Sequence, residues 1–351
     1  MIKKRKSNLN IAALLTVEAG LDTLRILNEK IFIDCVITLH TKAELGNMIS
    51  GYTDVTQFCD DSKIKCIQVS SYSLSERKDI ELLKREDIDV LLVLGWQRLV
   101  PEWLIKHVKI AVLGGHGSAY GITGGRGRSP QNWALIMGEK TFTLSLFKID
   151  VGVDSGNVIL ERTFEYSCYD NIETSYFKVS WLMAEMILEV FSYGELNAFQ
   201  GKPQHGDVYF LPKRVPDDGA IDWKMNSESI YNLVRALTSP YPGAFSICSG
   251  IKVMIWKAIP FRIPVNVLEY RSGEICQIFH DDCFVVKCGD DEFMLIQKWS
   301  SAEEWKPVIG LTFDSCDEKE IYLNIIERHY KSNSYNEQTL HPRIMGKGKL
   351  L

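Results

Sequence analysis

The chain has 351 residues, of which 46% are hydrophobic and 24% charged, and its formal net charge is −5. These values are typical of a globular protein of about two domains, and an acidic chain without a long basic run disfavours a nucleic-acid partner. The apolar run at residues 11–15 is too short for a signal peptide or a membrane span, so we expect no membrane partner. The nine cysteines form no CxxC pair and no metal-type spacing with histidine, which favours reduced thiols in the cytoplasm and indicates no metal site.

Strands and helices alternate through the first third of the chain. Short apolar or β-branched runs predict strands at residues 11–15, 31–39, 66–70, 89–94 and 110–113. Helical spacing of apolar residues predicts helices at residues 17–30, 76–85 and 102–107. This alternation predicts an α/β fold with a doubly wound, mostly parallel sheet. The sequence contains neither a dinucleotide-type GxGxxG between a strand and a helix nor a GxxxxGK[ST] phosphate loop.

A glycine-rich segment, Gly114–Ser118, follows the fifth expected strand and carries His116, and a later turn carries Asp150 and Asp154. Ligands of open α/β sheets bind at the carboxyl edge of the strands, so we expect His116 at that edge with Asp154 beside it. A neighbouring carboxylate favours imidazolium and fixes its orientation, which suits acid/base work and oxyanion stabilisation in acyl transfer. The residues alone also fit a structural turn histidine and solvated aspartates.

A second glycine-rich stretch, residues 121–127, leads to Arg126 and Arg128. Pro130 suits the first turn of a helix that we expect at residues 130–137. The two arginines could bind a phosphate or a carboxylate bidentately. Solvated loop arginines are an equally good interpretation.

The second half begins with a long helix, expected at residues 172–193. Apolar residues at three- and four-residue spacing predict its buried face: Phe177, Trp181, Ala184, Leu188 and Phe191. Residues 228–237 and 317–330 are expected to be helical. Short β-rich runs between them predict a small barrel or sandwich: residues 252–258, 272–279, 283–288 and 293–298.

These elements divide the chain into an α/β domain at residues 1–200, a smaller β-rich domain at residues 201–330 and a polar, basic tail at residues 331–351. Residues 196–204 are expected to be a connection, because glycine and proline interrupt them. Apolar strands in the last third of the chain could support a homodimer.

In their order along the chain, these motifs resemble the formyltransferase family that uses 10-formyltetrahydrofolate. That family includes methionyl-tRNA, glycinamide ribonucleotide and sugar-nucleotide formyltransferases. Residues 114–118 are similar to the Asn-x-His-x-Ser pattern of the family, and residues 126–130 to its Arg-Gly-x-x-Pro step. Residues 130–137 are similar to its tryptophan-containing helix, residues 138–139 to its Gly-Glu pair and residues 154–156 to its Asp-x-Gly turn. Residues 94–101 resemble the pterin-binding loop of the family, and residues 214–245 resemble the start of its C-terminal domain. The likeness covers roughly residues 10–260.

The resemblance implies a formyltransferase-like, Rossmann-type domain followed by a smaller β-rich domain, with 10-formyltetrahydrofolate as co-substrate. It gives His116 and Asp154 catalytic roles. It implies folate contacts by the loop residues and one turn residue: Gly95, Trp96, Gln97, Arg98, Leu99, Val100 and Asp150. Ser118, Arg126 and Arg128 are the candidate substrate-binding residues.

One position departs from the family pattern, because Gly114 stands where the family has a catalytic asparagine. Losing one oxyanion donor can cost about 10²–10³-fold in rate. A backbone N–H of residues 114–117 could donate instead, or Asn132 could reach in from its helix. A third interpretation is a protein that binds ligand without catalysis. The presence of both His116 and Asp154 favours the first two.

We therefore expect formyl transfer to the primary amine of a nucleotide-linked amino-deoxy sugar, for surface glycan biosynthesis. The acidic charge disfavours tRNA, and the Arg-Gly-Arg-x-Pro-x-Asn-Trp run is similar to the sugar branch of the family. The alternatives are a methionyl-tRNA formyltransferase and a catalytically inactive folate or nucleotide-sugar binding protein.

Overall fold

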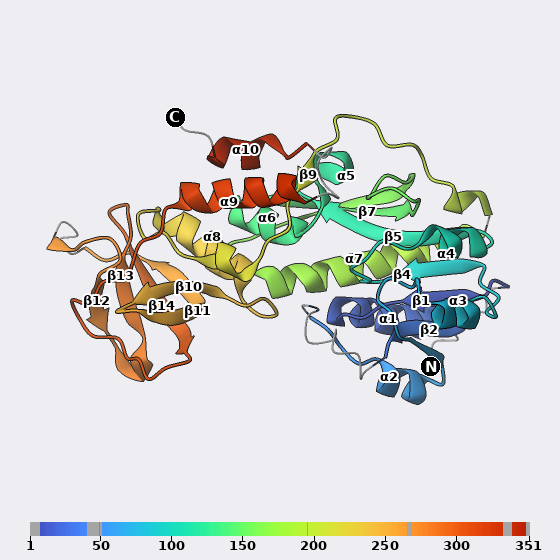
Figure 1. Ribbon diagram of the computed structural model, residues 1–351, viewed down its shortest axis with the longest axis horizontal. Coiled ribbons are helices and arrows are strands. Elements are labelled where there is room, and N and C mark those ends of the chain that lie inside the picture. The colour runs from blue at the N-terminus through green and yellow to red at the C-terminus, as the bar shows by residue number, and fades with distance from the viewer. Residues whose placement is uncertain are drawn as a thin grey trace. The chain divides into compact units, whose positions relative to one another are not determined.

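The computed structural model describes residues 8–40, 49, 51–194, 196–264, 269–332 and 339–348, which form two compact units (Figure 1). Unit 1 comprises Met1–Arg126, Thr141–Glu165 and Tyr176–Val208, and unit 2 comprises Gly127–Lys140, Tyr166–Ser175 and Tyr209–Leu351. None of the helices in the described residues has the length and apolar character that crossing a membrane requires.

A seven-stranded sheet runs through unit 1 in the order β3-β2-β1-β4-β5-β7-β8 (Figure 1). Its strands are β1 (Ile11–Leu14), β2 (Cys35–Leu39), β3 (Lys65–Val69), β4 (Val90–Val93), β5 (Ala111–Ser118), β7 (Thr141–Lys148) and β8 (Val158–Glu165). β1 to β5 are parallel, and β7 and β8 continue the sheet antiparallel. β1 and β2 are buried along their whole length, as strands covered on both faces must be. The predicted doubly wound, mostly parallel sheet is confirmed.

Helices cover both faces of this sheet. They are α1 (Glu18–Lys30), α2 (Thr56–Ser62), α3 (Arg77–Leu83), α4 (Glu102–His107), α5 (Gly121–Gly124) and α7 (Ile172–Ser192). One apolar cluster joins Leu24 of α1 and Ile187 of α7 to Leu92 of β4. A second cluster joins Leu104 of α4 to Leu91 of the same strand. Leu91 and Leu92 point to opposite faces because side chains alternate along a strand.

The exposed side of α7 differs from the predicted one. Phe177 and Trp181, expected in the buried face, are 55% and 67% exposed, and that part of the prediction is wrong. The helix is buried instead along a neighbouring row that includes Met183 and Ile187, together with Ala184 as predicted. Apolar residues extend around two adjacent sides of this helix, and the sheet covers one of them.

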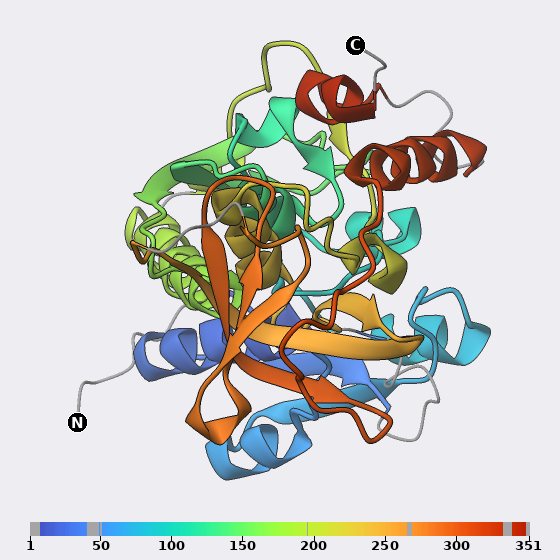
Figure 2. The same ribbon diagram turned by 90° about the vertical axis from the view of Figure 1, so that its left-hand side faces the viewer.

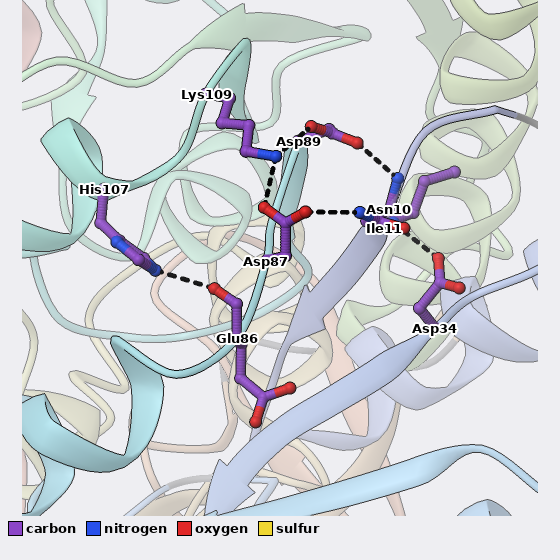
Figure 3. Close-up of polar contacts among 8 residues, drawn as sticks. All are labelled: Asn10, Ile11, Asp34, Glu86, Asp87, Asp89, His107 and Lys109. Carbon is purple, nitrogen blue, oxygen red and sulfur yellow. Dashed lines mark hydrogen bonds and ion pairs between the residues drawn. The ribbon is translucent and has the colours of Figure 1, made fainter.

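Carboxylates hold the amino edge of the sheet, where β1 begins (Figure 3). Asp89 accepts a hydrogen bond from the Asn10 N–H at 2.8 Å, and Asp34 accepts one from the Ile11 N–H at 2.7 Å. Lys109 lies 3.5 Å from Asp89 and adds a cation to the group. This network stabilises the edge opposite to the one where α/β sheets bind ligands.

Unit 2 contains a five-stranded antiparallel sheet in the order β10-β11-β14-β13-β12, coloured gold to orange in Figure 2. Its strands are β10 (Ala244–Cys248), β11 (Ile251–Phe261), β12 (Ile275–Ile278), β13 (Phe284–Lys287) and β14 (Phe293–Ser301). Aromatic rings fill its core, where Trp223, Phe284 and Trp305 surround Phe313 at centroid distances of 5.5–6.1 Å. The predicted smaller β-rich C-terminal domain is confirmed, and it takes the form of one antiparallel sheet.

The helices of unit 2 are α6 (Pro130–Ile136), α8 (Ser227–Leu237), α9 (Glu318–Lys331) and α10 (Pro342–Gly348). Two further short strands are β6 (Arg126–Gly127) and β9 (Phe210–Leu211). α10 belongs to the stretch that the sequence describes as a basic tail, and its Ile344 is fully buried. Residues 333–338 and 349–351 of that stretch lie outside the described residues.

Candidate active site

β5 carries His116 to the carboxyl edge of the sheet. β4 and β5 run in parallel register until Val93 lies beside Gly114. β5 then continues along β7, where His116 is opposite Ser145. In the same sheet β1 has β2 on one side and β4 on the other, so the strand order reverses between β1 and β4. Ligands of doubly wound sheets bind at the carboxyl ends of the strands at such a switch point.

Both ring nitrogens of His116 face oxygen acceptors. The side chain is 8% exposed. Its Nε2 donates to the Gly125 carbonyl at 2.7 Å, and its Nδ1 lies 3.4 Å from Oδ2 of Asp154. Carbonyl and carboxylate oxygens can only accept, so the doubly protonated ring satisfies both contacts. The structure thus brings together the two residues that the sequence selects, in a geometry suited to proton transfer or oxyanion stabilisation.

The turn that carries Asp154 is held in a special backbone conformation. Asp154 itself has φ +49°, a left-handed conformation that costs a non-glycine residue about 1–2 kcal/mol. Asp150 accepts hydrogen bonds from the Gly152 N–H at 3.0 Å and the Ser155 hydroxyl at 2.6 Å. The carboxylate of Asp150 therefore shapes the turn, and the carboxylate of Asp154 points to the histidine.

Arg126 lies against the same turn. Its guanidinium donates to Oε1 of Gln204 at 2.6 Å, while its buried Nε has no partner among the described residues. Burial lowers the pKa of Arg126 from its usual range, and the negative charges of Asp154 and Asp150 oppose that shift. One arm of this candidate substrate-binding residue is therefore engaged within unit 1.

Sequence reasoning missed Gln204, which lies in the expected connection. Its Nε2 donates to the carbonyls of Asp154 at 2.8 Å and Gly156 at 2.7 Å. A single glutamine in a segment broken by glycine and proline carries no signal of such a role. Only the folded turn reveals it.

Tyr72 was missed as well, and it organises the segment that resembles a pterin-binding loop. Its hydroxyl accepts a hydrogen bond from the Gln97 N–H at 2.9 Å. Its ring meets the Trp96 ring edge-on at 4.7 Å, and the Arg98 guanidinium lies 5.1 Å above it. The hydroxyl of Thr16 donates to the Gly95 carbonyl at 3.3 Å. The shape of the loop therefore depends on residues at the carboxyl ends of β1 and β3.

The loop keeps hydrogen-bonding groups that no described residue uses. The backbone groups of Arg98, Leu99 and Val100 have no hydrogen-bond partner among the described residues. The buried Nε1 of Trp96 has none there either. A row of unpaired donors and acceptors beside a buried aromatic side chain fits a flat heterocycle with polar edges.

Three further predicted site residues have structural contacts. Ser118 is fully buried, and its hydroxyl accepts from the Tyr120 N–H at 3.0 Å. In unit 2, Arg128 donates its backbone N–H to Leu211 at 3.0 Å. Also in unit 2, Asn132 is 1% exposed and its amide donates to the Ala236 carbonyl at 2.7 Å. The Oδ1 of Asn132 is buried without a hydrogen-bond partner in the described residues.

The position of the family asparagine is closely packed. A Cβ on Gly114 would lie 2.6 Å from Cδ1 of Ile149, a distance that real Cβ atoms do not adopt. A side chain at position 114 would therefore require the end of the Ile149 side chain to shift.

Comparison with known proteins gives a consistent result. Residues 11–191 match the model of the formyl transferase family, and residues 214–306 match that of the formyl transferase C-terminal domain. The bifunctional polymyxin resistance protein ArnA of Wigglesworthia glossinidia brevipalpis is 30% identical over 61% of this chain and 35% of its own length. A methionyl-tRNA formyltransferase of Thermodesulfovibrio yellowstonii is 32% identical over 51% of this chain and 57% of its own. The chain thus spans about a third to just over half of these relatives.

A solved structure has a similar fold. The N-formyltransferase of Helicobacter canadensis, in complex with folinic acid and dTDP-3-aminofucose, superposes with a TM-score of 0.57. It is 16% identical, and the match covers 82% of this chain and 99% of that one.

Proposed function

Because the chain belongs to the formyl transferase family, we propose that it transfers a formyl group from 10-formyltetrahydrofolate to the primary amine of a nucleotide-linked amino-deoxy sugar. The observation that carries the proposal is the contact between His116 and Asp154 at the carboxyl edge of the sheet. Acyl transfer to an amine needs proton transfer and oxyanion stabilisation at one point, and this pair supplies both.

Proton transfers are assigned to the two side chains. When bound, 10-formyltetrahydrofolate supplies the formyl carbon, and the substrate amine attacks as the uncharged base because an ammonium has no lone pair. His116, oriented by Asp154, donates a hydrogen bond from Nε2 to the developing oxyanion in place of the Gly125 carbonyl, and then transfers that proton to the departing nitrogen. Asp154 accepts the proton that the amine loses.

A backbone group of β5 is the donor that we assign in place of the family asparagine. Ile149 donates its N–H to the Val112 carbonyl, so alternate residues of β5 turn their backbone groups away from β7. Gly117 belongs to that alternate set and lies beyond the pairing of β5 with β4, which ends at Val93. Its N–H group can reach an oxyanion near His116 without a side chain at position 114.

The folate is assigned to the segment from Gly95 to Val100. The unpaired backbone groups of Arg98, Leu99 and Val100 support this assignment, because a pterin ring presents a row of donors and acceptors. The unpaired Trp96 Nε1 adds one donor. The complex of the Helicobacter canadensis protein with folinic acid supports a folate site in this fold.

A nucleotide-linked amino sugar is the acceptor that we favour. The net charge of −5 suits a small anionic substrate held by a few arginines better than tRNA, whose phosphates demand a basic face. The Helicobacter canadensis complex contains dTDP-3-aminofucose. Methionyl-tRNA is the second candidate, because methionyl-tRNA formyltransferases are among the relatives. We further propose that the protein acts in the cytoplasm in surface glycan synthesis, and its nine free cysteines suit a reducing compartment.

A mass-spectrometric assay decides between the acceptors. The whole protein is incubated with 10-formyltetrahydrofolate and, separately, a panel of UDP- and dTDP-linked amino sugars or methionyl-tRNA. We expect one sugar nucleotide to gain a formyl group, with no formylation of the tRNA. Formylation of the tRNA alone would refute the sugar assignment. No product from any amine while folate binds would favour a catalytically inactive binding protein.

A further inference from the structure

A closed ring of contacts surrounds His116, and Gln204 completes it. The two partners of the imidazole are Asp154 at Nδ1 and the carbonyl of Gly125 at Nε2. Gln204 donates to the backbone carbonyl of Asp154. Its Oε1 accepts from Arg126, the residue next to Gly125 in the chain. One side chain thus joins the two segments that hold the two ring nitrogens.

The contacts use the particular chemistry of a glutamine amide. Both polar atoms of Gln204 are engaged, with Nε2 donating to Asp154 and Gly156 and Oε1 accepting from Arg126. A glutamate at position 204 would keep the acceptor for Arg126. It would lose both donors and place a negative charge against two carbonyl oxygens. A methionine would keep the length of the side chain and lose all three hydrogen bonds.

The turn needs such support because its conformation is unfavourable in isolation. Asp154 is held at φ +49°, which persists only where surrounding contacts fix it. The two hydrogen bonds from Gln204 hold the backbone on the C-terminal side of Asp154, at its own carbonyl and at that of Gly156. If they are lost, the turn can relax and carry the carboxylate away from Nδ1 of His116.

We propose that Gln204 is a positioning residue for formyl transfer, which fixes the orientation of His116 by clamping both Asp154 and the Gly125–Arg126 segment. The proposal rests on the proposed function. It also gives Arg126 a role in the same clamp, besides any contact with substrate. Displacing a reacting group by about 1 Å can cost roughly 10²-fold in rate. The loss should therefore appear in kcat, while the binding of folate and amine is retained.

The test compares Gln204→Met and Gln204→Glu with a matched control, Gln200→Met. Gln200 is exposed, and within the described residues its side chain has one hydrogen bond, which it accepts from Lys148 at 3.5 Å. Steady-state turnover of the whole protein gives kcat and KM for 10-formyltetrahydrofolate and for the amine. NMR of the histidine ring nitrogens gives a readout that needs no turnover, with the His116 signals identified by their loss in His116→Gln.

We expect both Gln204 variants to lose roughly 10- to 100-fold in kcat with KM unchanged, and Gln200→Met to match the wild type. The His116 ring signals should shift in the Gln204 variants and stay in place in the control. Wild-type kcat in either folded Gln204 variant, or unmoved His116 signals, would overturn the clamp. If the wild type formylates no amine, the proposed function fails, and the NMR comparison still decides whether Gln204 positions His116.

Discussion

At the residue scale, a few side chains determine which groups the candidate site can offer to a reacting formyl group. Ile149 packs closely against Gly114, so a hydrophobic contact stands where the family pattern has a side-chain donor. His116 and Asp154 are nevertheless within reach of each other at 3.4 Å. The contact between these two side chains is therefore present without the asparagine, and in the proposed mechanism the oxyanion depends on a backbone donor and on the imidazole.

Tyr72 gives a prediction at this scale. Replacing it with phenylalanine removes the hydroxyl that accepts from the Gln97 N–H and keeps the ring between Trp96 and Arg98. A hydrogen bond contributes about 1 kcal/mol, so we expect KM for 10-formyltetrahydrofolate to rise roughly fivefold with kcat retained. Steady-state kinetics measure both constants.

Tyr193→Phe is the control for that variant, because the Tyr193 hydroxyl donates to the partly exposed Glu189 in the last turn of α7. It should leave KM unchanged. An unaltered KM in Tyr72→Phe would show that the loop does not depend on this hydroxyl, and so would contradict the role given to Tyr72.

At the scale of elements, the two edges of the sheet in unit 1 have different roles, one in the candidate site and the other in stability. The carboxyl edge carries the candidate site. At the amino edge, carboxylates accept hydrogen bonds from the backbone where β1 begins (Figure 3). Asp89, one of these carboxylates, is 13% exposed, whereas Asp87, which also pairs with Lys109, is 63% exposed. The ammonium of Lys109 therefore has one largely buried partner and one exposed partner.

This difference predicts unequal stability effects. Asp89→Ala leaves the Asn10 N–H without its acceptor and should lower the free energy of unfolding by about 1–3 kcal/mol. Asp87→Ala removes an exposed ion pair, which is worth about 0–1 kcal/mol. Urea unfolding followed by circular dichroism compares the two variants, and turnover should be retained in both. Equal destabilisation by the two substitutions would contradict the role assigned to Asp89.

On the scale of the whole molecule, the sequence was sufficient where periodicity and order along the chain carry the information. The alternating strands and helices predicted the parallel sheet, and the order of motifs around His116 predicted the family. Periodicity predicted the wrong buried residues in part of α7. Phe177 and Trp181 form an apolar row, but the spacing of apolar residues does not indicate which side of the helix packs against the sheet. It gave no sign of Gln204 or Tyr72, whose roles depend on contacts between segments far apart in the chain.

The most direct test of the account is turnover by His116→Gln, with His107→Gln as its control. His107 donates to the Glu86 carbonyl at 2.9 Å, at the edge shown in Figure 3, and has no part in the site. With 10-formyltetrahydrofolate and the amine that the wild type formylates, we expect His116→Gln to lose roughly 10²–10⁴-fold in kcat and His107→Gln to retain it. Wild-type turnover in His116→Gln would contradict the central claim that this histidine, held by Asp154, carries out the transfer.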